Sequence, residues 1–415
     1  MNMKLLTVAM LGSSLLLTAC GENEDGFGFT PKPNIPENNI KDPVVGIPVS
    51  YTKSDFSAVA SESSVMTYKM LGQNGNETMA TSLLFVPKIS MPEGGWKIVA
   101  WAHGTTGVAD QCAPSRNETH IAIQGMISQL LAAGYVVVAP DYEGLGEPSG
   151  RESHPFLNVK SEAFSITDAV VAARSYLASQ GKITSREWMA VGHSQGGQAA
   201  LGAAQYASRA KLDYKGTVAV APASHLGGIL IMGNEAVKDA PLAQKIAMYT
   251  QLDTFTALIT AGLRNTNPTL TYLDIFKSPT DRIASQAENL CAAGDLSLGQ
   301  AFGAGMYAYA MQNGNSLNGY PRTNADFMFI PMVNNFLQKD SQPAQVKLNQ
   351  PVIIYQGAKD TTIPKQVTDA LVSQAQSKGS KIEYITNAEW DHNTAYAMNI
   401  GNIVNDVKAT MPVSN

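Results

Sequence analysis

The stretch WMAVGHSQGGQAA, residues 188–200, decides how the rest of the chain is interpreted. It opens with four apolar residues, which indicate a buried strand, and it closes with a helix-forming segment. Between the two lies Gly192-His193-Ser194-Gln195-Gly196, a serine with a glycine two positions away on either side. Glycines at these positions let a strand and a helix approach closely while the serine is held in a strained turn. This arrangement is the setting of an activated serine, so Ser194 is the candidate nucleophile.

Two side chains farther along the chain are candidates for activating Ser194. A serine hydroxyl is a poor nucleophile until a base takes its proton, and histidine suits that role best. Of the six histidines, His392 follows the last predicted strand, where the order nucleophile, acid, base puts the base. Asp360 comes after the apolar segment 351–355, at the carboxyl edge of the predicted sheet, where functional residues gather. We expect Asp360 to hold the His392 imidazole; the alternative is Asp391, whose place directly before His392 makes the ring hard to reach.

A serine nucleophile that attacks a carbonyl group also needs donors for the oxygen that becomes negative. The backbone N–H of Gln195, the residue after the nucleophile, is one expected donor. The second is expected from the loop after the third predicted strand, which reads WAHGTTG at 101–107. Thr105 is our choice within this loop, and Thr106 is the alternative.

Short apolar segments alternate with longer helix-like segments over most of the chain. Segments 65–71 and 79–86 are joined by Gly72-Gln73-Asn74-Gly75, whose Asn-Gly pair is typical of a hairpin. From residue 96 onward the alternation predicts crossover units and a mostly parallel sheet, which is an α/β fold. The predicted parallel strands are 97–102, 135–139, 188–191, 217–221, 351–355 and 381–385. The predicted helices between them include 121–133, 162–177 with a capping box at Ser165 and Asp168, and about 195–207.

One interval is too long for a single crossover. The predicted strands that end at 221 and begin at 351 are separated by far more residues than one connecting helix requires. This interval contains helix-like stretches at 235–252 and 255–263 and a region rich in Met and aromatic residues. We expect a large, mainly helical lid inserted after the sixth strand. The predicted domains are the lid at 223–345 and a catalytic domain formed by 46–222 and 346–415.

The N-terminus has the features of an export signal. Lys4 is followed by an apolar run and then by Leu17-Thr18-Ala19-Cys20, which resembles the lipobox of bacterial lipoproteins. The resemblance implies a signal peptide at 1–19, a lipidated Cys20 and a cell-envelope location, with the outer membrane favoured. The alternative is an ordinary secretory signal that contains a cysteine. Residues 20–45 combine Gly, Pro, Asn and charge, which predicts a flexible tether.

The two remaining cysteines, Cys112 and Cys291, form an even count in a compartment where disulfides persist. We therefore expect them to pair; the alternative is two buried thiols. The net charge of −5 and the lack of a Lys and Arg run disfavour nucleic acid as a partner. The chemistry expected of Ser194 needs no metal ion and no organic cofactor.

Four motifs together resemble the secretory lipase family of the α/β-hydrolase superfamily, over a region from residue 51 to the C-terminus. They are HGTTG at 103–107, DYEGLG at 141–146, GHSQGG at 192–197 and QGAKD at 356–360. The resemblance implies a helical lid after the sixth strand, carboxylic ester hydrolysis and an ester substrate, either a lipid or an acylated small molecule or polysaccharide. Two other classes stay open, a serine peptidase on the same fold and a non-catalytic envelope-binding protein.

Overall fold

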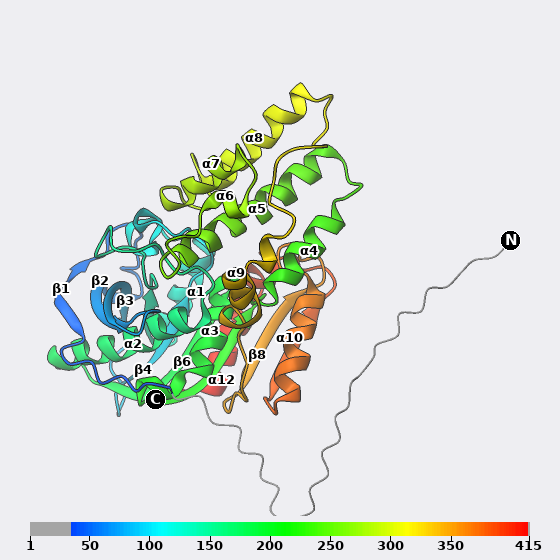
Figure 1. The fold of residues 1–415 in the computed structure, drawn as a ribbon. Helices are drawn as coiled ribbons and strands as arrows, with labels where there is room; N and C mark the ends of the chain where they lie inside the picture. The colour runs from blue at the N-terminus through cyan, green and yellow to red at the C-terminus, as the bar shows by residue number, and fades with distance from the viewer. Residues whose placement is uncertain (1–34, 414–415) are drawn as a thin grey trace, which may run out of the picture. The chain divides into compact units, whose positions relative to one another are not determined.

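A nine-stranded sheet with the order β1-β2-β3-β5-β4-β6-β7-β8-β9 organises the computed structural model, which describes residues 35–413 (Figure 1). The N-terminal strands are antiparallel to their neighbours, and every pairing from β5 to β9 is parallel. The strands are β1 Val44–Ser50, β2 Ala60–Leu71, β3 Glu77–Pro87, β4 Trp96–Ala102, β5 Val136–Pro140, β6 Thr184–His193, β7 Asp213–Val220, β8 Val352–Gly357 and β9 Ile382–Asn387. The α/β fold and the mostly parallel sheet are confirmed, with one strand more than the eight predicted.

Helices cover both faces of the parallel part of the sheet, which explains why its strands are continuous apolar runs. On one face pack α1 (Ile121–Ala132) and α12 (Ile400–Thr410). On the other face pack α2 (Val159–Ser179), α3 (Gln195–Gln205) and α10 (Lys365–Ser377). Two apolar cores therefore fix the strands from both sides, and the carboxyl ends of the strands are left to the connecting loops.

The start of α2 differs from the prediction. Its N-cap is Asn158, whose side chain accepts a hydrogen bond from the backbone N–H of Ser161 at 3.1 Å. Ser165 and Asp168, predicted as a capping box, lie buried inside the helix instead. Asp168 pairs with buried Arg209 at 2.7 Å. Asp168 is thus a buried partner of Arg209 and does not mark the start of the helix. The predicted capping box of Ser165 and Asp168 was wrong.

The predicted tether also ends earlier than expected. The Asn38 side chain donates to Asp168 at 2.8 Å, and its backbone N–H donates to the Arg209 carbonyl at 2.8 Å. Residues 44–50 then form strand β1, which pairs with β2. Asn38 is therefore bound to the domain through a buried ion pair, and residues 44 and 45 are bound through the pairing of β1 with β2. The predicted signal peptide, Cys20 and the rest of the predicted tether up to residue 34 lie outside the described residues.

A mainly helical segment, here called the insertion (residues 221–351), connects β7 to β8. Its α-helices are α4 Leu226–Ala236, α5 Leu242–Arg264, α6 Tyr272–Ile275, α7 Thr280–Ala284, α8 Leu298–Gln312 and α9 Pro331–Asn335. Helices α5 to α8 lie together beyond the sheet (Figure 1). The insertion has an apolar core and a nearly buried ion pair, in which Arg322 contacts Asp253 at 2.6 Å. It follows the sixth predicted strand, which is the seventh in the structure because β1 precedes the others.

The insertion is tied to the loop after β4 by a covalent bond and a hydrogen bond. Cys112 and Cys291 form a disulfide with a Cα–Cα distance of 5.4 Å, as the cysteine count predicts. The backbone N–H of Ala292, beside Cys291, donates to the Thr106 carbonyl at 2.9 Å. The loop that carries Thr105 and Thr106 and the insertion therefore meet at a fixed point. No helix within residues 35–413 has the length and apolarity to cross a membrane.

Replacing both Cys112 and Cys291 with serine should lower the thermal stability of the protein. The disulfide joins residues 179 positions apart. Closing so long a loop stabilises the folded state by about 3–5 kcal/mol through the entropy of the unfolded chain. The melting temperature should therefore fall by roughly 5 °C, which calorimetry can measure. Reductant should lower the melting temperature of the parent but not that of the double variant; equal melting temperatures would contradict the stabilising role.

Candidate active site

Ser194 occupies a sharp turn between β6 and α3. Its backbone has φ 60° and ψ −121°, a conformation that side-chain-bearing residues rarely adopt. A Cβ atom on Gly192 would lie 2.0 Å from the Gly196 carbonyl oxygen. A Cβ atom on Gly196 would lie 1.9 Å from the carbonyl oxygen of Ala102, at the end of β4. The close backbone approach therefore requires glycine at both positions of the motif. The resulting turn places Ser194 at the carboxyl edge of the sheet.

Asp360 and His392 lie in hydrogen-bond contact. The Nδ1 atom of His392 is 2.8 Å from Oδ2 of Asp360, whose carboxyl group is buried. The other oxygen of Asp360 accepts backbone N–H groups from Thr362 at 2.8 Å and Ile363 at 2.7 Å. Because Nδ1 donates to a fixed carboxylate, Nε2 of His392 is left free to accept a proton.

The alternative acid, Asp391, has a different role in the structure. One of its carboxylate oxygens accepts the backbone N–H groups of Asn393 and Thr394. It is exposed at the start of α11 (Thr394–Ala397), and these hydrogen bonds, with that from Thr394 first, lower its pKa. The structure therefore brings Asp360, and not Asp391, to the His392 ring.

His193, next to Ser194, fixes the backbone of His392. Its Nε2 donates to the His392 carbonyl at 2.9 Å, and its ring stacks on Tyr396 with centroids 5.2 Å apart. Burial, followed by repulsion from His392, lowers the pKa of His193 to about 3. His193 is thus a neutral donor at ordinary pH. Among residues 35–413 no hydrogen bond joins Ser194 to His392, but both side chains line one cavity.

The residues of the two expected oxyanion donors, Gln195 and Thr105, both lie near Ser194. Gln195 is the first residue of α3, where a backbone N–H has no partner within the helix. Thr105 lines a pocket together with Ser194 and Gln195. A Cβ atom on Gly104, which precedes Thr105, would be 3.8 Å from the Cβ of Ser194. Thr106 lines the larger cavity, and its carbonyl is bound to the insertion.

A buried polar group that the sequence analysis missed holds the side chain of Gln195. Its Nε2 donates to Oε1 of Glu162 at 2.7 Å and to Nε2 of His154 at 2.8 Å. Nδ1 of His154 in turn donates to the Glu143 carbonyl at 2.8 Å, which leaves its Nε2 as an acceptor. Burial raises the pKa of Glu162, and the hydrogen bond from Gln195 opposes that shift. The one sequence signal for this group was the acidic Glu162 in the otherwise largely apolar first turns of α2.

Changing Glu162 to Leu should impair turnover more than substrate binding. The apolar side chain would remove the acceptor that holds the Gln195 side chain, so the first turn of α3 would lose its fixed position. We expect kcat to fall about 10-fold, or ~1.4 kcal/mol, with KM nearly unchanged. Glu152→Leu is a matched control, since Glu152 contacts Thr78 rather than Gln195. A loss of stability without a change in kcat per folded molecule would reject the positioning role.

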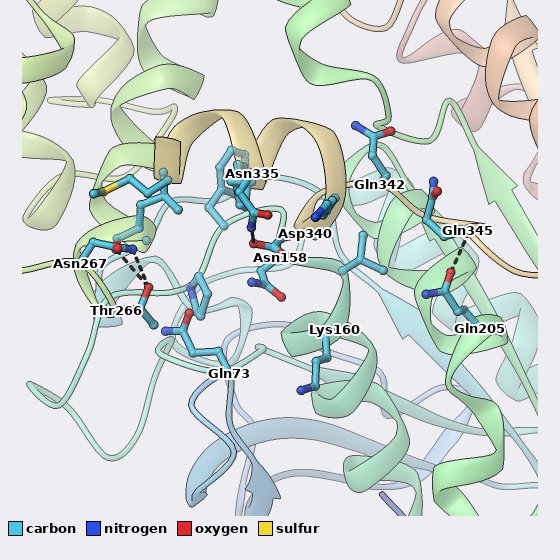
Figure 2. A pocket seen from close by; sticks show the side chains of 18 of the residues that line it. Gln73, Asn158, Lys160, Gln205, Thr266, Asn267, Asn335, Asp340, Gln342 and Gln345 are labelled. Carbon is cyan, nitrogen blue, oxygen red and sulfur yellow. Dashed lines mark hydrogen bonds between the residues drawn. The ribbon is translucent and has the colours of Figure 1, made fainter. Parts of the chain in front are cut away.

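Two cavities open at Ser194, and a third lies elsewhere against the insertion. The largest, about 1060 Å³, is lined by Ser194 and His392 and by parts of the insertion. A small apolar pocket of about 30 Å³ also opens at Ser194. A third, polar cleft of about 590 Å³ lies between the insertion and α2, and none of Ser194, Asp360 and His392 lines it; Figure 2 shows its many carboxamide side chains. Within residues 35–413 no three His, Cys, Asp or Glu side chains are grouped to hold a metal ion.

The parallel sheet covered by helices on both faces, with a serine in the turn between a central strand and its helix, defines the α/β-hydrolase fold. The secretory lipase family model matches residues 118–410, so the chain belongs to the secretory lipase family. Membership of this family indicates a hydrolase. Together with the Cys112–Cys291 disulfide, it also indicates a protein that acts outside the cytoplasm.

Solved structures from several organisms share the fold. A protein of Legionella pneumophila is 16% identical, with a TM-score of 0.67 over 90% of this chain and 100% of its own. The rice cell wall degrading esterase LipA from Xanthomonas oryzae is 19% identical, with a TM-score of 0.64 over 89% and 97%. Candida antarctica lipase A is 16% identical, with a TM-score of 0.65 over 90% and 83%. A comparison with curated proteins gives no significant match.

Proposed function

We propose that this protein is a serine carboxylic ester hydrolase. The observation that carries the proposal is the joint position of Ser194 and the His392–Asp360 pair: a serine in a strained strand-to-helix turn and an imidazole held by a buried carboxylate line the same cavity. Family membership supports hydrolysis, and the fold is shared with a cell wall degrading esterase and a lipase. The ester is the substrate class that these relatives suggest.

The reaction proceeds in two steps through an acyl-enzyme. His392 takes the proton of Ser194 through Nε2 as the hydroxyl oxygen attacks the ester carbonyl carbon. The backbone N–H groups of Gln195 and Thr105 stabilise the negative oxygen of the tetrahedral intermediate. His392 returns the proton to the leaving alcohol, and Asp360 stabilises the imidazolium throughout. Water then enters, and its oxygen attacks the acyl carbon as His392 takes one of its protons. The bond from the acyl carbon to Ser194 Oγ breaks, His392 returns the proton to Oγ, and the acyl group departs as a carboxylic acid.

The insertion serves as a lid over this site. Gln251, Phe255 and Cys291, all from the insertion, line the cavity that Ser194 and His392 share. The lid is attached to the loop of Thr105 through the Cys112–Cys291 disulfide and the hydrogen bond from Ala292. The proposed limits of the lid are 223–345, with the catalytic domain at 46–222 and 346–415.

Ser194→Ala should abolish both ester hydrolysis and covalent labelling by a fluorophosphonate. The reagent bonds to an activated serine, so labelling of the intact protein reports the nucleophile directly. Mass spectrometry should place the adduct on Ser194. An intact protein that resists labelling would contradict the proposal and favour a binding protein. Rates on aminoacyl amides far above those on esters would favour a peptidase.

Asp360→Asn and Asp391→Asn are a matched pair of variants that tests which aspartate acts with His392. Loss of the Asp360 carboxylate should lower kcat by roughly 10³- to 10⁴-fold, because the His392 imidazole is no longer fixed in the tautomer and orientation that catalysis requires. Asp391→Asn should change kcat by no more than about 3-fold, because Asp391 is exposed and its carboxylate contacts only the neighbouring Asn393 and Thr394. The reverse order would assign the acid to Asp391.

We also propose that Cys20 carries lipid and holds the enzyme at the cell-envelope membrane, with the outer membrane favoured. Cys20→Ser should therefore move the protein from the membrane fraction to the soluble fraction and prevent incorporation of labelled palmitate. Cys291→Ser is the control, because it should leave both properties unchanged. A Cys20→Ser protein that stays in the membrane fraction would refute the lipid anchor and leave ester hydrolysis untouched.

A further inference from the structure

Two spaces of very different size meet at Ser194. The small pocket has a volume of about 30 Å³, and the large cavity has about 1060 Å³. Both linings include Ser194 and Thr105, and Phe255 of α5 also borders both. A carbonyl group attacked by Ser194 therefore stands at the junction of the two spaces, and its two substituents must occupy different ones.

The position of His392 decides which substituent enters which space. His392 lines the large cavity but not the small pocket. The leaving alcohol oxygen must receive its proton from the imidazole, so the alcohol lies on the side of His392. Gln195, whose backbone N–H faces the oxyanion, lines the small pocket. With the alcohol on the side of His392, in the large cavity, the acyl chain is left with the small pocket.

The small pocket limits the length of the acyl chain. Its volume of about 30 Å³ is a small fraction of the roughly 1060 Å³ of the large cavity, so the shorter substituent of the ester belongs there. We take a butyryl group as the longest acyl chain that fits. Its walls include Leu226, Ile229 and Leu230 of α4 and Ile259 of α5, each buried in the apolar core of the insertion. A longer chain would have to displace these packed side chains.

The large cavity has the opposite character. Four residues that line it carry a buried polar atom with no hydrogen-bond partner within the described part of the chain: Trp101 (Nε1), Thr106 (Oγ1), Gln251 (Nε2) and Thr254 (Oγ1). Buried polar atoms ordinarily find partners, and the hydroxyl groups of a bound alcohol would supply them to side chains such as Gln251 that turn toward the cavity. The charged residues of the lining are the acidic Glu118 and Asp295, with no Lys or Arg. The cavity therefore favours an uncharged alcohol over an anionic one.

We infer that the substrates are short-chain esters, from acetyl to butyryl, of a bulky, uncharged, hydroxyl-bearing alcohol. This inference rests on the proposed ester hydrolysis at Ser194. It assigns α4 as the determinant of acyl length and Gln251 of α5 as a determinant of the alcohol.

A series of esters that share one alcohol and differ in acyl length tests the first half. The value of kcat/KM should be highest between acetate and butyrate and roughly 100-fold lower for octanoate. Leu230→Ala should open the small pocket and raise the octanoate-to-butyrate ratio of kcat/KM about 10-fold. Leu252→Ala is the matched control, because Leu252 is buried in the same apolar core but does not line the pocket. A ratio measured within one variant is independent of how much of that variant is folded.

Gln251→Leu tests the second half. It should lower kcat/KM for an acetylated neutral sugar about 10-fold while leaving p-nitrophenyl acetate, whose alcohol has no hydroxyl groups, within about 2-fold. Preference of the parent enzyme for octanoate, or an unchanged ratio in Leu230→Ala, would overturn the acyl assignment. Equal effects of Gln251→Leu on both acetates would overturn the alcohol assignment. Fluorophosphonate labelling of Ser194 separates these failures from failure of the proposed function, because labelled enzyme with the wrong preference rejects only this inference.

Discussion

The close backbone contact around Gly192 and Gly196 is the constraint on which the site depends. With no room for a Cβ at either position, β6, α3 and the end of β4 meet, and Ser194 must adopt its positive φ. Hydrogen bonds from several elements hold this conformation. The Ser194 N–H donates to the Val220 carbonyl at 2.9 Å, and its carbonyl accepts from the N–H of Ala223 at 3.2 Å. The surrounding sheet thus sustains a strained residue that would relax if the turn stood alone.

Two buried polar systems extend this rigidity to either side of the serine. On one side, Gln356 donates to the Asp360 carboxylate at 3.2 Å and accepts from the Thr368 hydroxyl of α10 at 2.7 Å. On the other side, Glu162 of α2 holds Gln195. Buried polar groups of this kind give a unique arrangement because each one left unpaired would be costly. The residues that would meet the substrate are therefore positioned by the helices that cover the sheet.

The elements with a local sequence pattern could be predicted from the sequence. The contacts between residues far apart along the chain could not. Strands β4 to β9 and the Ser194 turn have strong local signals, because parallel strands are apolar throughout and glycine spacing is fixed by contact. Strand β1 was missed because Gly46, Pro48 and an exposed edge position give no alternating apolar pattern. The contact between His154 and Gln195 joins residues 41 positions apart, and no periodicity predicts it. The two cavities at Ser194 could not be predicted from the sequence either, because they form where helices of the insertion meet the core.

The disulfide also determines what happens when the chain is cut. It closes a covalent loop from residue 112 to residue 291 that includes Ser194, the parallel strands β5, β6 and β7, and helices α4 and α5. A single peptide bond broken inside this loop leaves both fragments in one molecule. The apolar cores and the β-ladders would keep such fragments in place. Outside the cytoplasm, where thiols stay oxidised, a nicked molecule would gain only the mass of one water and would keep its assembled site until a reductant separated the pieces.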